Sequence, residues 1–580
     1  MIKKFQISNF KFQIFLVVII ILAASLRLWN IALNPPGLTW DEAAIGYNAY
    51  SLLKTGRDEY GQILPLNFKS FGDYKPGVYI YADVPFVALF GLNELAVRMP
   101  SVIAGVFLVL LIYLLVNGLF NNKSLALSVA LMLAVSPLAI QFSRPAFESN
   151  LAVFLNCLGI FCFIRGLKKS NLFIPAGLFF GLSLFTYQAS RIFIPILILG
   201  LFLIYKKDLS FKKDLRIGLG IFILFVLLVG TQILVLKQSS RLEAMNYFAY
   251  RRSDEQINQI AKEDGYQVSD YKFQILHGEW FAYLKGLTER YLIYFSPKML
   301  FIDGDYSPRH RVPDLGVLYY ISALLIPLGI IYLWGRKERG AKLIFFLLAI
   351  SSMPAVLSRD LISMVRALNL LLPLTILEGA GLYYLLLNIK KFNRFIFISV
   401  SLIIFFLISA NLVVFLDRYF IHASIKYSQG WLYGYKDLLA LQCDQLYFAL
   451  AKPCLLPEAK GKEIFFSKEN LSKYDNILMT DDYGQPYIYY LFYSVYTPDK
   501  FQKQAILEQP SIDVGTVRRI DNIAFRHVYW PKDRGLKNSL FIATKEELPD
   551  QDIIPYPQYK ILKDINFLDG QHAFRVVESE

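Results

Sequence analysis

The chain has 580 residues, of which 55% are hydrophobic, 16% aromatic and only 18% charged. Soluble domains carry about 25% charged residues, whereas apolar runs of about 20 residues recur here, each long enough to cross a ~30 Å hydrocarbon core. The composition excludes an ordinary soluble protein and predicts a polytopic α-helical membrane protein.

The formal net charge of +14 comes from the distribution of Lys and Arg between segments. Short loops assigned to the cytoplasm carry 19 basic and 3 acidic residues, whereas the tail from 417 onward carries 20 basic and 22 acidic residues. An excess of Lys and Arg in cytoplasmic loops is a signal of membrane topology. We therefore expect no nucleic-acid partner.

The first apolar run, 14–33, lacks a small-residue cleavage site, so we interpret it as an uncleaved first span that leaves the N-terminus in the cytoplasm. Placing the basic loops inside predicts about eleven spans in the plasma membrane: 14–33, 97–118, 124–142, 150–164, 172–187, 192–205, 217–236, 314–334, 343–357, 367–387 and 395–416. The predicted transmembrane domain is thus 1–416, and the tail is extracytoplasmic.

The apolar segment 78–92 is treated differently from the other runs. It is short, it contains Asp83 and Pro85, and a crossing there would place every later basic loop outside. We therefore expect a juxtamembrane helix lying in the interface. This assignment puts both Asp41 and Glu148 on the outer face.

The tail, 417–580, is predicted to form a small extracytoplasmic α/β domain, because β-rich stretches at 476–480, 524–530, 540–544 and 573–577 alternate with helical ones. Six tyrosines between 483 and 496 favour a domain core with aromatic edges over a membrane-surface cluster. In an extracytoplasmic tail, Cys443 and Cys454 could form a disulfide, although their spacing does not decide it.

An acidic pair, Asp41 and Glu42, follows the first span directly. The turn at 35–37 holds the pair near the bilayer edge, where Trp29 and Trp40 mark the boundary. A carboxylate in this position can take a proton from an acceptor hydroxyl. The alternative is a pair of acids that only stabilise the first turn of a helix.

A second acid, Glu148, lies in a short outer loop, 143–149. It could share one cavity with Asp41, in which case one carboxylate acts as base and the other as orienting group or metal ligand. A divalent ion such as Mg²⁺ or Mn²⁺ held by these two acids is compatible with the sequence, which does not otherwise indicate a cofactor. The alternative is an ion pair between Glu148 and Arg144.

Lys and Arg residues near the extracytoplasmic ends of the spans are less expected than those at the cytoplasmic ends. As a set they suit binding of a lipid phosphate. The alternative for each is a snorkelling or ion-pairing role. The residues that we favour for a phosphate are Lys75, Arg191, Arg309 and His310.

Several motifs in order resemble the GT-C glycosyltransferases of the protein O-mannosyltransferase and aminoarabinose-transferase type, glycosyltransferase family 39. The motifs are Trp40-Asp41-Glu42, Lys75-Pro76-Gly77-Val78-Tyr79, Phe90-Gly91, Ala96 to Ser101, Ser136-Pro137 and Ser143-Arg144-x-Ala146-x-Glu148. The resemblance covers most of the first 200 residues and, in layout only, the later spans. The tail lacks the β-trefoil repeats of eukaryotic protein mannosyltransferases.

The resemblance implies a GT-C fold and transfer of a sugar from a polyprenyl-phosphate donor to a hydroxyl on protein, lipid or glycan, with inversion. It implies that Asp41 is the catalytic acid-base residue, Glu148 the second acid and Lys75 the lysine near the donor phosphate. No ATP-binding P-loop motif is present, in agreement with a lipid-linked donor.

Two alternatives to this transferase remain. One is a related membrane transferase of another substrate class, and the other is a lipid or polysaccharide translocase or scaffold without transferase activity. Few ionisable residues fall in the middle of the predicted spans, which disfavours a translocase.

Overall fold

The computed structural model describes residues 9–71, 73–209, 213–235, 246–249, 251–439, 472–508 and 515–580. The chain divides into two compact units, each assembled from separate stretches. Unit 1 comprises Met1–Ala23, Phe107–Ile140 and Ala152–Val413, and unit 2 comprises Ala24–Val106, Gln141–Leu151 and Val414–Glu580.

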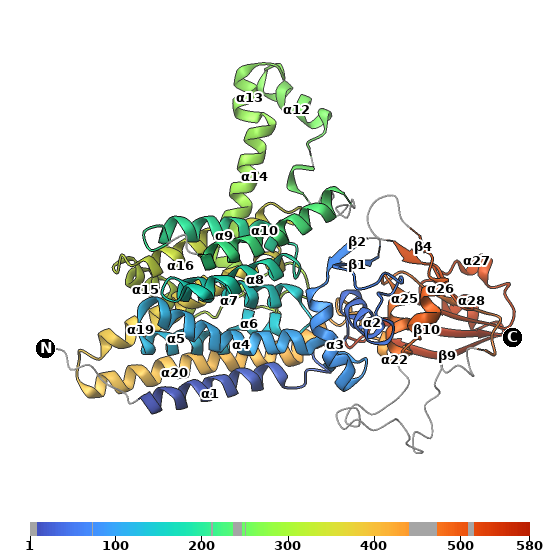
Figure 1. Cartoon of the computed structure of the whole chain (residues 1–580). Helices are drawn as coiled ribbons and strands as arrows, with labels where there is room; N and C mark the ends of the chain where they lie inside the picture. The colour runs from blue at the N-terminus through green and yellow to red at the C-terminus, as the bar shows by residue number, and fades with distance from the viewer. Residues whose placement is uncertain are drawn as a thin grey trace. The chain divides into compact units, whose positions relative to one another are not determined.

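Unit 1 is helical (Figure 1). Wholly within it lie α5 (Lys123–Val135), α8 (Phe173–Leu184), α9 (Ser190–Tyr205), α10 (Lys213–Leu234), α15 (Ser322–Trp334), α16 (Arg339–Ile350) and α19 (Leu371–Ile389). Small residues allow α15 and α19 to approach closely: a Cβ on Gly381 would lie 1.9 Å from the carbonyl oxygen of Leu325. Such contacts between small residues are typical of helices packed in a membrane.

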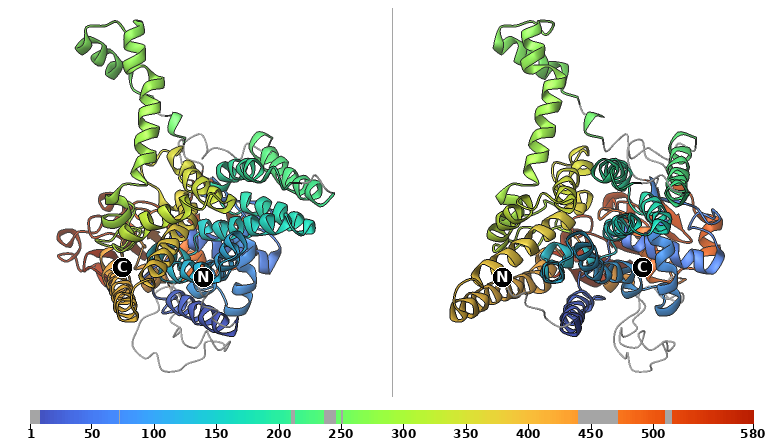
Figure 2. Two further views of the ribbon diagram at one scale, coloured as in Figure 1. Left: turned by 90° about the vertical axis from the view of Figure 1, so that its left-hand side faces the viewer. Right: turned by 60° about the vertical axis from the view of Figure 1, so that its left-hand side comes forward.

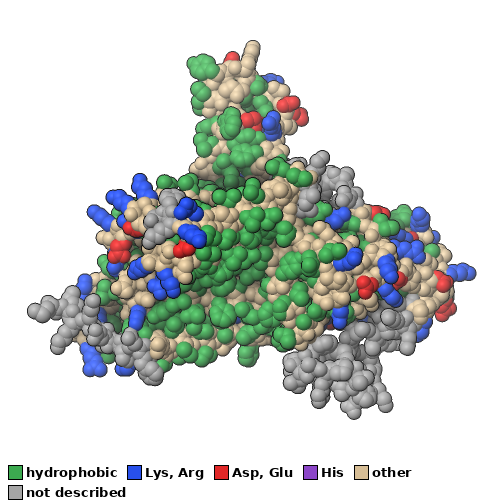
Figure 3. Space-filling model, viewed as in Figure 1, with side chains coloured by type: hydrophobic (Ala, Val, Ile, Leu, Met, Phe, Trp, Pro, Cys, Tyr) green, Lys and Arg blue, Asp and Glu red, His purple; other side chains and the backbone are tan. Residues whose placement is uncertain are grey.

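Four long helices have residues in both units: α1 (Asn9–Leu28), α4 (Glu94–Phe120), α7 (Glu148–Gly166) and α20 (Arg394–Asp417). Hydrophobic side chains cover much of the visible face of the helical region (Figure 3). Over the described residues, seven helices are long and apolar enough to cross a membrane, or eight if the bent pair Lys123–Val135 and Pro137–Ser143 counts as one span.

All eleven segments predicted to cross the membrane contain helix. Eight match the long helices or the bent pair, and three match shorter apolar helices, Ser170–Leu184, Ser190–Tyr205 and Ser322–Trp334. The predicted class of polytopic α-helical membrane protein is confirmed, whereas crossing by the three shorter helices stays a prediction. The segment 78–92 forms another short apolar helix, α3 (Val78–Phe90).

An arm of three helices stands away from the bundle of unit 1 in both views of Figure 2. It consists of α12 (Asp254–Asp264), α13 (Tyr271–His277) and α14 (Glu279–Ile293). Its exposed apolar side chains include Ile275, Trp280 and Leu284. The arm lies between the predicted spans 217–236 and 314–334, in a segment that the predicted topology places outside the cytoplasm.

Unit 2 contains α2 (Trp40–Thr55), α3, the hairpin of β1 (Asn67–Ser70) and β2 (Asp73–Pro76), and a six-stranded sheet of order β6-β7-β3-β8-β10-β9. The sheet strands are β3 (Asn476–Met479), β6 (Arg519–Ile520), β7 (Ile523–Phe525), β8 (Ser539–Ala543), β9 (Tyr559–Asn566) and β10 (His572–Ser579). β3 is parallel to both β7 and β8, and the remaining pairs are antiparallel. The predicted α/β tail is confirmed.

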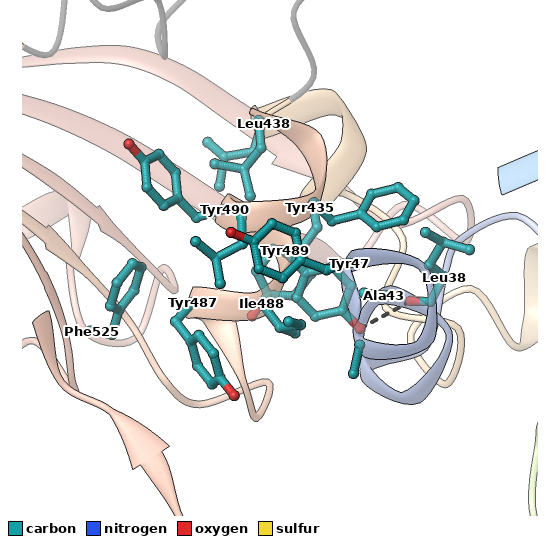
Figure 4. Packing of buried hydrophobic residues seen from close by; sticks show 14 of the residues in the cluster. Leu38, Ala43, Tyr47, Tyr435, Leu438, Tyr487, Ile488, Tyr489, Tyr490 and Phe525 are labelled. Carbon is teal, nitrogen blue, oxygen red and sulfur yellow. Dashed lines mark hydrogen bonds between the residues drawn. The ribbon is translucent and has the colours of Figure 1, made fainter. Parts of the chain in front are cut away.

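The tyrosine-rich stretch forms α25 (Pro486–Tyr493), which packs against α2. Tyr487, Tyr489 and Tyr490 are buried, and the ring of Tyr489 stacks on that of Tyr435 with centroids 4.0 Å apart (Figure 4). The hydroxyl of Tyr489 donates to the carbonyl of Leu38 at 3.0 Å. The preferred interpretation, a domain core, is confirmed, and this core joins the tail to the start of α2.

The domain boundary predicted between 416 and 417 remains a prediction. The end of unit 1 at Val413 lies close to it, but unit 2 also includes 24–106 and 141–151 from the N-terminal part of the chain. Cys443 and Cys454 lie outside the described residues. Cys157 and Cys162 are free and buried.

Candidate functional site

The site is built around the first turn of α2. Thr39 caps the helix: its hydroxyl accepts the N–H of Glu42 at 3.2 Å, and its own N–H donates to Oε2 of Glu42 at 3.0 Å. This reciprocal arrangement is the capping box that the order Thr-x-x-Glu favours. It fixes where the helix begins and therefore where Asp41 is placed.

Glu42 is also half of a buried ion pair. Its Oε1 accepts from Nε of Arg98 at 3.2 Å and from the backbone N–H of Ala146 at 3.0 Å. The side chain of Arg98 is fully buried and donates to the carbonyls of Ile31, Pro35 and Gly37 at 2.6–3.0 Å. The pair therefore ties the turn after the first span to α2 and α4, and the Glu42 carboxylate accepts from three donors in all: the N–H of Thr39, Nε of Arg98 and the N–H of Ala146.

Arg144, like Arg98, is a buried donor to backbone carbonyls. It is fully buried and donates to the carbonyls of Leu26, Arg27 and Asn34 at 2.8–3.1 Å. Its guanidinium also lies 4.6 Å from the ring centroid of Phe420. These contacts of Arg144 hold the end of α1 and the turn that follows it.

Asp41 and Lys75, which are far apart in the chain, are in contact. The Lys75 ammonium donates to Oδ1 of Asp41 and lies 4.8 Å from the ring centroid of Phe71. Lys75 is carried by the β1–β2 hairpin, where it pairs with Phe68. Its side chain is 9% exposed and that of Asp41 is 40% exposed. The buried cation thus has an acidic partner that solvent can reach.

Glu148 begins α7 and is half-buried. Both Glu148 and Glu42 interact electrostatically with the hydroxyl of Tyr79, which donates to the carbonyl of Val97 at 3.0 Å. Two of the three predicted catalytic acids therefore lie within electrostatic range of one buried phenol. A shared cavity for Glu148 and Asp41 stays a prediction.

The other residues predicted to bind phosphate lie in unit 1. Nε of Arg191, at the start of α9, donates to the carbonyl of Leu184 at 3.3 Å. His310 lies beside Asp305, with Nδ1 and Oδ2 3.6 Å apart, and Arg309 precedes it in the same half-buried loop. Asp305 also accepts the N–H of Met364 at 2.6 Å. A common phosphate site with Lys75 stays a prediction.

Glu59, in the loop after α2, is a further acid near Lys75 that was not among the predicted site residues. Glu59 is buried, its N–H donates to Oδ1 of Asn48 at 3.0 Å, and its carboxyl group interacts electrostatically with Lys75. Burial, followed by the charge of Asp58, raises the pKa of Glu59 from 4.5 to about 8. A loop acid carries no sequence signal of burial, so only the packing reveals it.

We expect Glu59→Gln to stabilise the protein more at high pH than at low pH. Between pH 4.5 and about 8 the folded protein keeps a proton that the unfolded chain releases, so the native Glu59 lowers stability progressively as pH rises. One pKa unit corresponds to about 1.4 kcal/mol, so the gain above pH 8 should reach several kcal/mol.

The measurement is the thermal midpoint of the purified protein in detergent at pH 5 and pH 9. Glu255→Gln, an exposed acid on α12, is the control and should shift the midpoint little at either pH. Equal shifts by Glu59→Gln at both pH values would contradict the assigned titration.

The chain matches known proteins over part of its length. Residues 75–231 match the family model described as dolichyl-phosphate-mannose-protein mannosyltransferase. The candidate mannosyltransferase YycA of Bacillus subtilis (strain 168) is 26% identical over 225 residues, which are 38% of this chain and 31% of YycA. The match thus spans about a third of that relative. These findings confirm the resemblance inferred from the sequence motifs.

Solved structures also resemble this chain. The archaeal oligosaccharyltransferase AglB from Archaeoglobus fulgidus, in complex with an inhibitory peptide and a dolichol-phosphate, aligns with 84% of this chain and 64% of its own, at 15% identity and a TM-score of 0.48. ArnT from Cupriavidus metallidurans, bound to undecaprenyl phosphate, aligns with 98% of both chains at 11% identity and a TM-score of 0.49.

Proposed function

We propose that this protein is a membrane glycosyltransferase that moves a sugar from a polyprenyl-phosphate donor to an acceptor hydroxyl on the extracytoplasmic face, with inversion. The observation that carries the proposal is the contact between Lys75 and Asp41. A cation that can neutralise a phosphate lies beside a solvent-accessible carboxylate that can take a proton. The family match, which begins at residue 75, supports the mannosyl and lipid-phosphate donor class.

In the proposed reaction, Asp41 removes the proton of the acceptor hydroxyl while that oxygen attacks the anomeric carbon of the sugar. The bond between this carbon and the phosphate oxygen breaks, and its electron pair leaves with the polyprenyl phosphate. Lys75 stabilises the charge that develops on the leaving phosphate.

The remaining predicted residues have supporting roles in this proposal. Glu42 positions Asp41, because its carboxylate is already bound by the helix cap, Arg98 and Ala146. Glu148 is the second acid, and Arg191, Arg309 and His310 are further candidates for binding a lipid phosphate. The acceptor is a hydroxyl on a protein, lipid or glycan.

We expect Lys75→Met to lower sugar transfer by about 10²- to 10³-fold, the usual effect of losing one group that stabilises developing charge. The assay supplies polyprenyl-phosphate mannose to the protein in nanodiscs with cell-envelope acceptors and measures released polyprenyl phosphate. Lys75→Arg should restore part of the loss, because it keeps the charge while changing the geometry.

Lys69→Met is the matched control, since Lys69 lies on the partner strand of the same hairpin, opposite Tyr74. Its transfer rate should stay within about twofold of wild type. Wild-type release rates in Lys75→Met would contradict the role of Lys75, and absence of release by the wild type with every polyprenyl-phosphate sugar offered would contradict the proposed activity.

A further inference from the structure

A second group of chemically active side chains lies at the C-terminal sheet and consists of residues that the proposed reaction does not use. Among the described His, Cys, Asp and Glu residues, one group has metal-ligand spacing: Asp482, His527 and Glu547, whose ligand atoms all lie within 4.8 Å of one another. Nδ1 of His527 is 3.2 Å from Oδ1 of Asp482 and 2.9 Å from Oε1 of Glu547.

The topology of the sheet explains why these three residues meet. Asp482 follows β3, His527 follows β7 and Glu547 follows β8, and these are the three neighbouring strands that run parallel. Parallel strands bring their carboxyl ends to one edge of the sheet. After β3 the chain forms β7 on one side of β3, and it then crosses to form β8 on the other side. Ligands of α/β proteins commonly bind at such a point.

Glu547 is held in place before any ligand arrives. Its side chain is 2% exposed. Oε1 accepts from the hydroxyl of Thr480 at 3.0 Å and the N–H of Val528 at 2.7 Å, while Oε2 accepts from the N–H and hydroxyl of Thr544 at 2.8 and 3.1 Å. Carboxylates that bind metals are typically oriented by such hydrogen bonds.

The other two residues are open to solvent, with 59% of the His527 side chain and 39% of the Asp482 side chain exposed. The neighbouring charges are already engaged elsewhere: Asp481 with Arg518 at 3.2 Å, and Arg526 with Asp533 at 2.7 Å. Together with the buried Glu547, the exposed imidazole and carboxylate therefore offer one nitrogen and two oxygen ligands. Solvent can reach this group of ligands from the side of His527 and Asp482.

We propose that Asp482, His527 and Glu547 form a divalent metal site of the zinc class. An imidazole with two carboxylates suits Zn²⁺, and three protein ligands leave an open fourth position for water or an anionic oxygen. The site lies at the loop that packs on α2: a Cβ on Gly484 would be 2.7 Å from the ring of Trp40, the residue before Asp41. The proposal does not depend on the transferase activity.

The test is calorimetric titration of ZnCl₂ into the purified full-length protein after removal of metals with a chelator. Wild type should show a micromolar or tighter site, and His527→Ala and Asp482→Asn should each weaken that site at least tenfold. His572→Ala, an exposed histidine on β10 of the same sheet, should leave the site unchanged. Thermal midpoints without metal identify any variant that fails to fold.

Absence of a zinc site in wild type, or equal affinity in wild type, His527→Ala and Asp482→Asn, would overturn the proposal. The three residues would then form only a polar contact in which His527 bridges the carboxylates of Asp482 and Glu547. Asp482→Asn keeps the size of an exposed side chain, so its result stands even if His527→Ala unfolds.

Discussion

Asp41→Asn should lower sugar transfer by about 10²- to 10⁴-fold, the contribution expected of a positioned general base. The amide keeps the size of the carboxylate but cannot take the proton of the acceptor hydroxyl. The Asn amide oxygen can still accept from the Lys75 ammonium, so this cation, whose side chain is only 9% exposed, keeps a polar partner. The variant should therefore insert, fold and bind donor lipid nearly as wild type does.

The matched control is Asp499→Asn, which removes an exposed acid from the first turn of α26 (Pro498–Gln504) in the same unit. Loss of a carboxylate at a helix N-terminus costs about 0.3–1 kcal/mol in either variant. Transfer should be lost in Asp41→Asn and unaffected in Asp499→Asn. Normal transfer by Asp41→Asn would remove Asp41 from the mechanism.

Arg98→Ala should be the most destabilising of the substitutions considered. It leaves the buried Glu42 carboxylate without its cation and three backbone carbonyls, of Ile31, Pro35 and Gly37, without a donor. Removing one partner of a buried ion pair costs about 3–5 kcal/mol. We expect a large fall in the thermal midpoint and in the yield of monodisperse protein.

Arg518→Ala provides the comparison, because Arg518 also contacts two acids, Asp481 and Glu508, but at an exposed position. Exposed ion pairs contribute about 0–1 kcal/mol, so its thermal midpoint should change little. Glu42→Gln should reproduce much of the Arg98→Ala defect, because it leaves a buried guanidinium without a countercharge. Wild-type thermal midpoints in both Arg98→Ala and Glu42→Gln would contradict the structural role of the pair.

The membrane helices were predictable because each apolar run is local and long. All eleven predicted segments contain helix. The positions of the basic loops predicted that 78–92 is not a further span, and this segment forms a short apolar helix, α3. The strands β3, β8 and β10 coincide with β-rich stretches, which are also local in sequence, whereas the stretch 524–530 overlaps β7 only at its start because Trp530 begins a short helix, α27 (Trp530–Asp533). The edge strand β9 was not predictable, because only one of its eight side chains is buried and the strand therefore gives little hydrophobic contrast between its faces.

The site was only partly predictable. Motif order indicated Asp41 and Lys75, but their contact depends on a hairpin that places Lys75 against α2. The roles of Arg98 and Arg144 as buried donors to backbone carbonyls, and the burial of Glu59, depend on packing between distant segments. Asp482, His527 and Glu547 meet only because three parallel strands end at one edge.

The central claim is that the donor phosphate binds where Lys75 meets Asp41, and photochemical labelling tests it most directly. A polyprenyl phosphate with a photoreactive group beside the phosphate would be crosslinked to the protein in nanodiscs, and the labelled peptides mapped by mass spectrometry. We predict labelling of the β1–β2 hairpin and the start of α2, reduced by Lys75→Met and by excess unlabelled lipid. Competable labelling confined to other segments would contradict the claim.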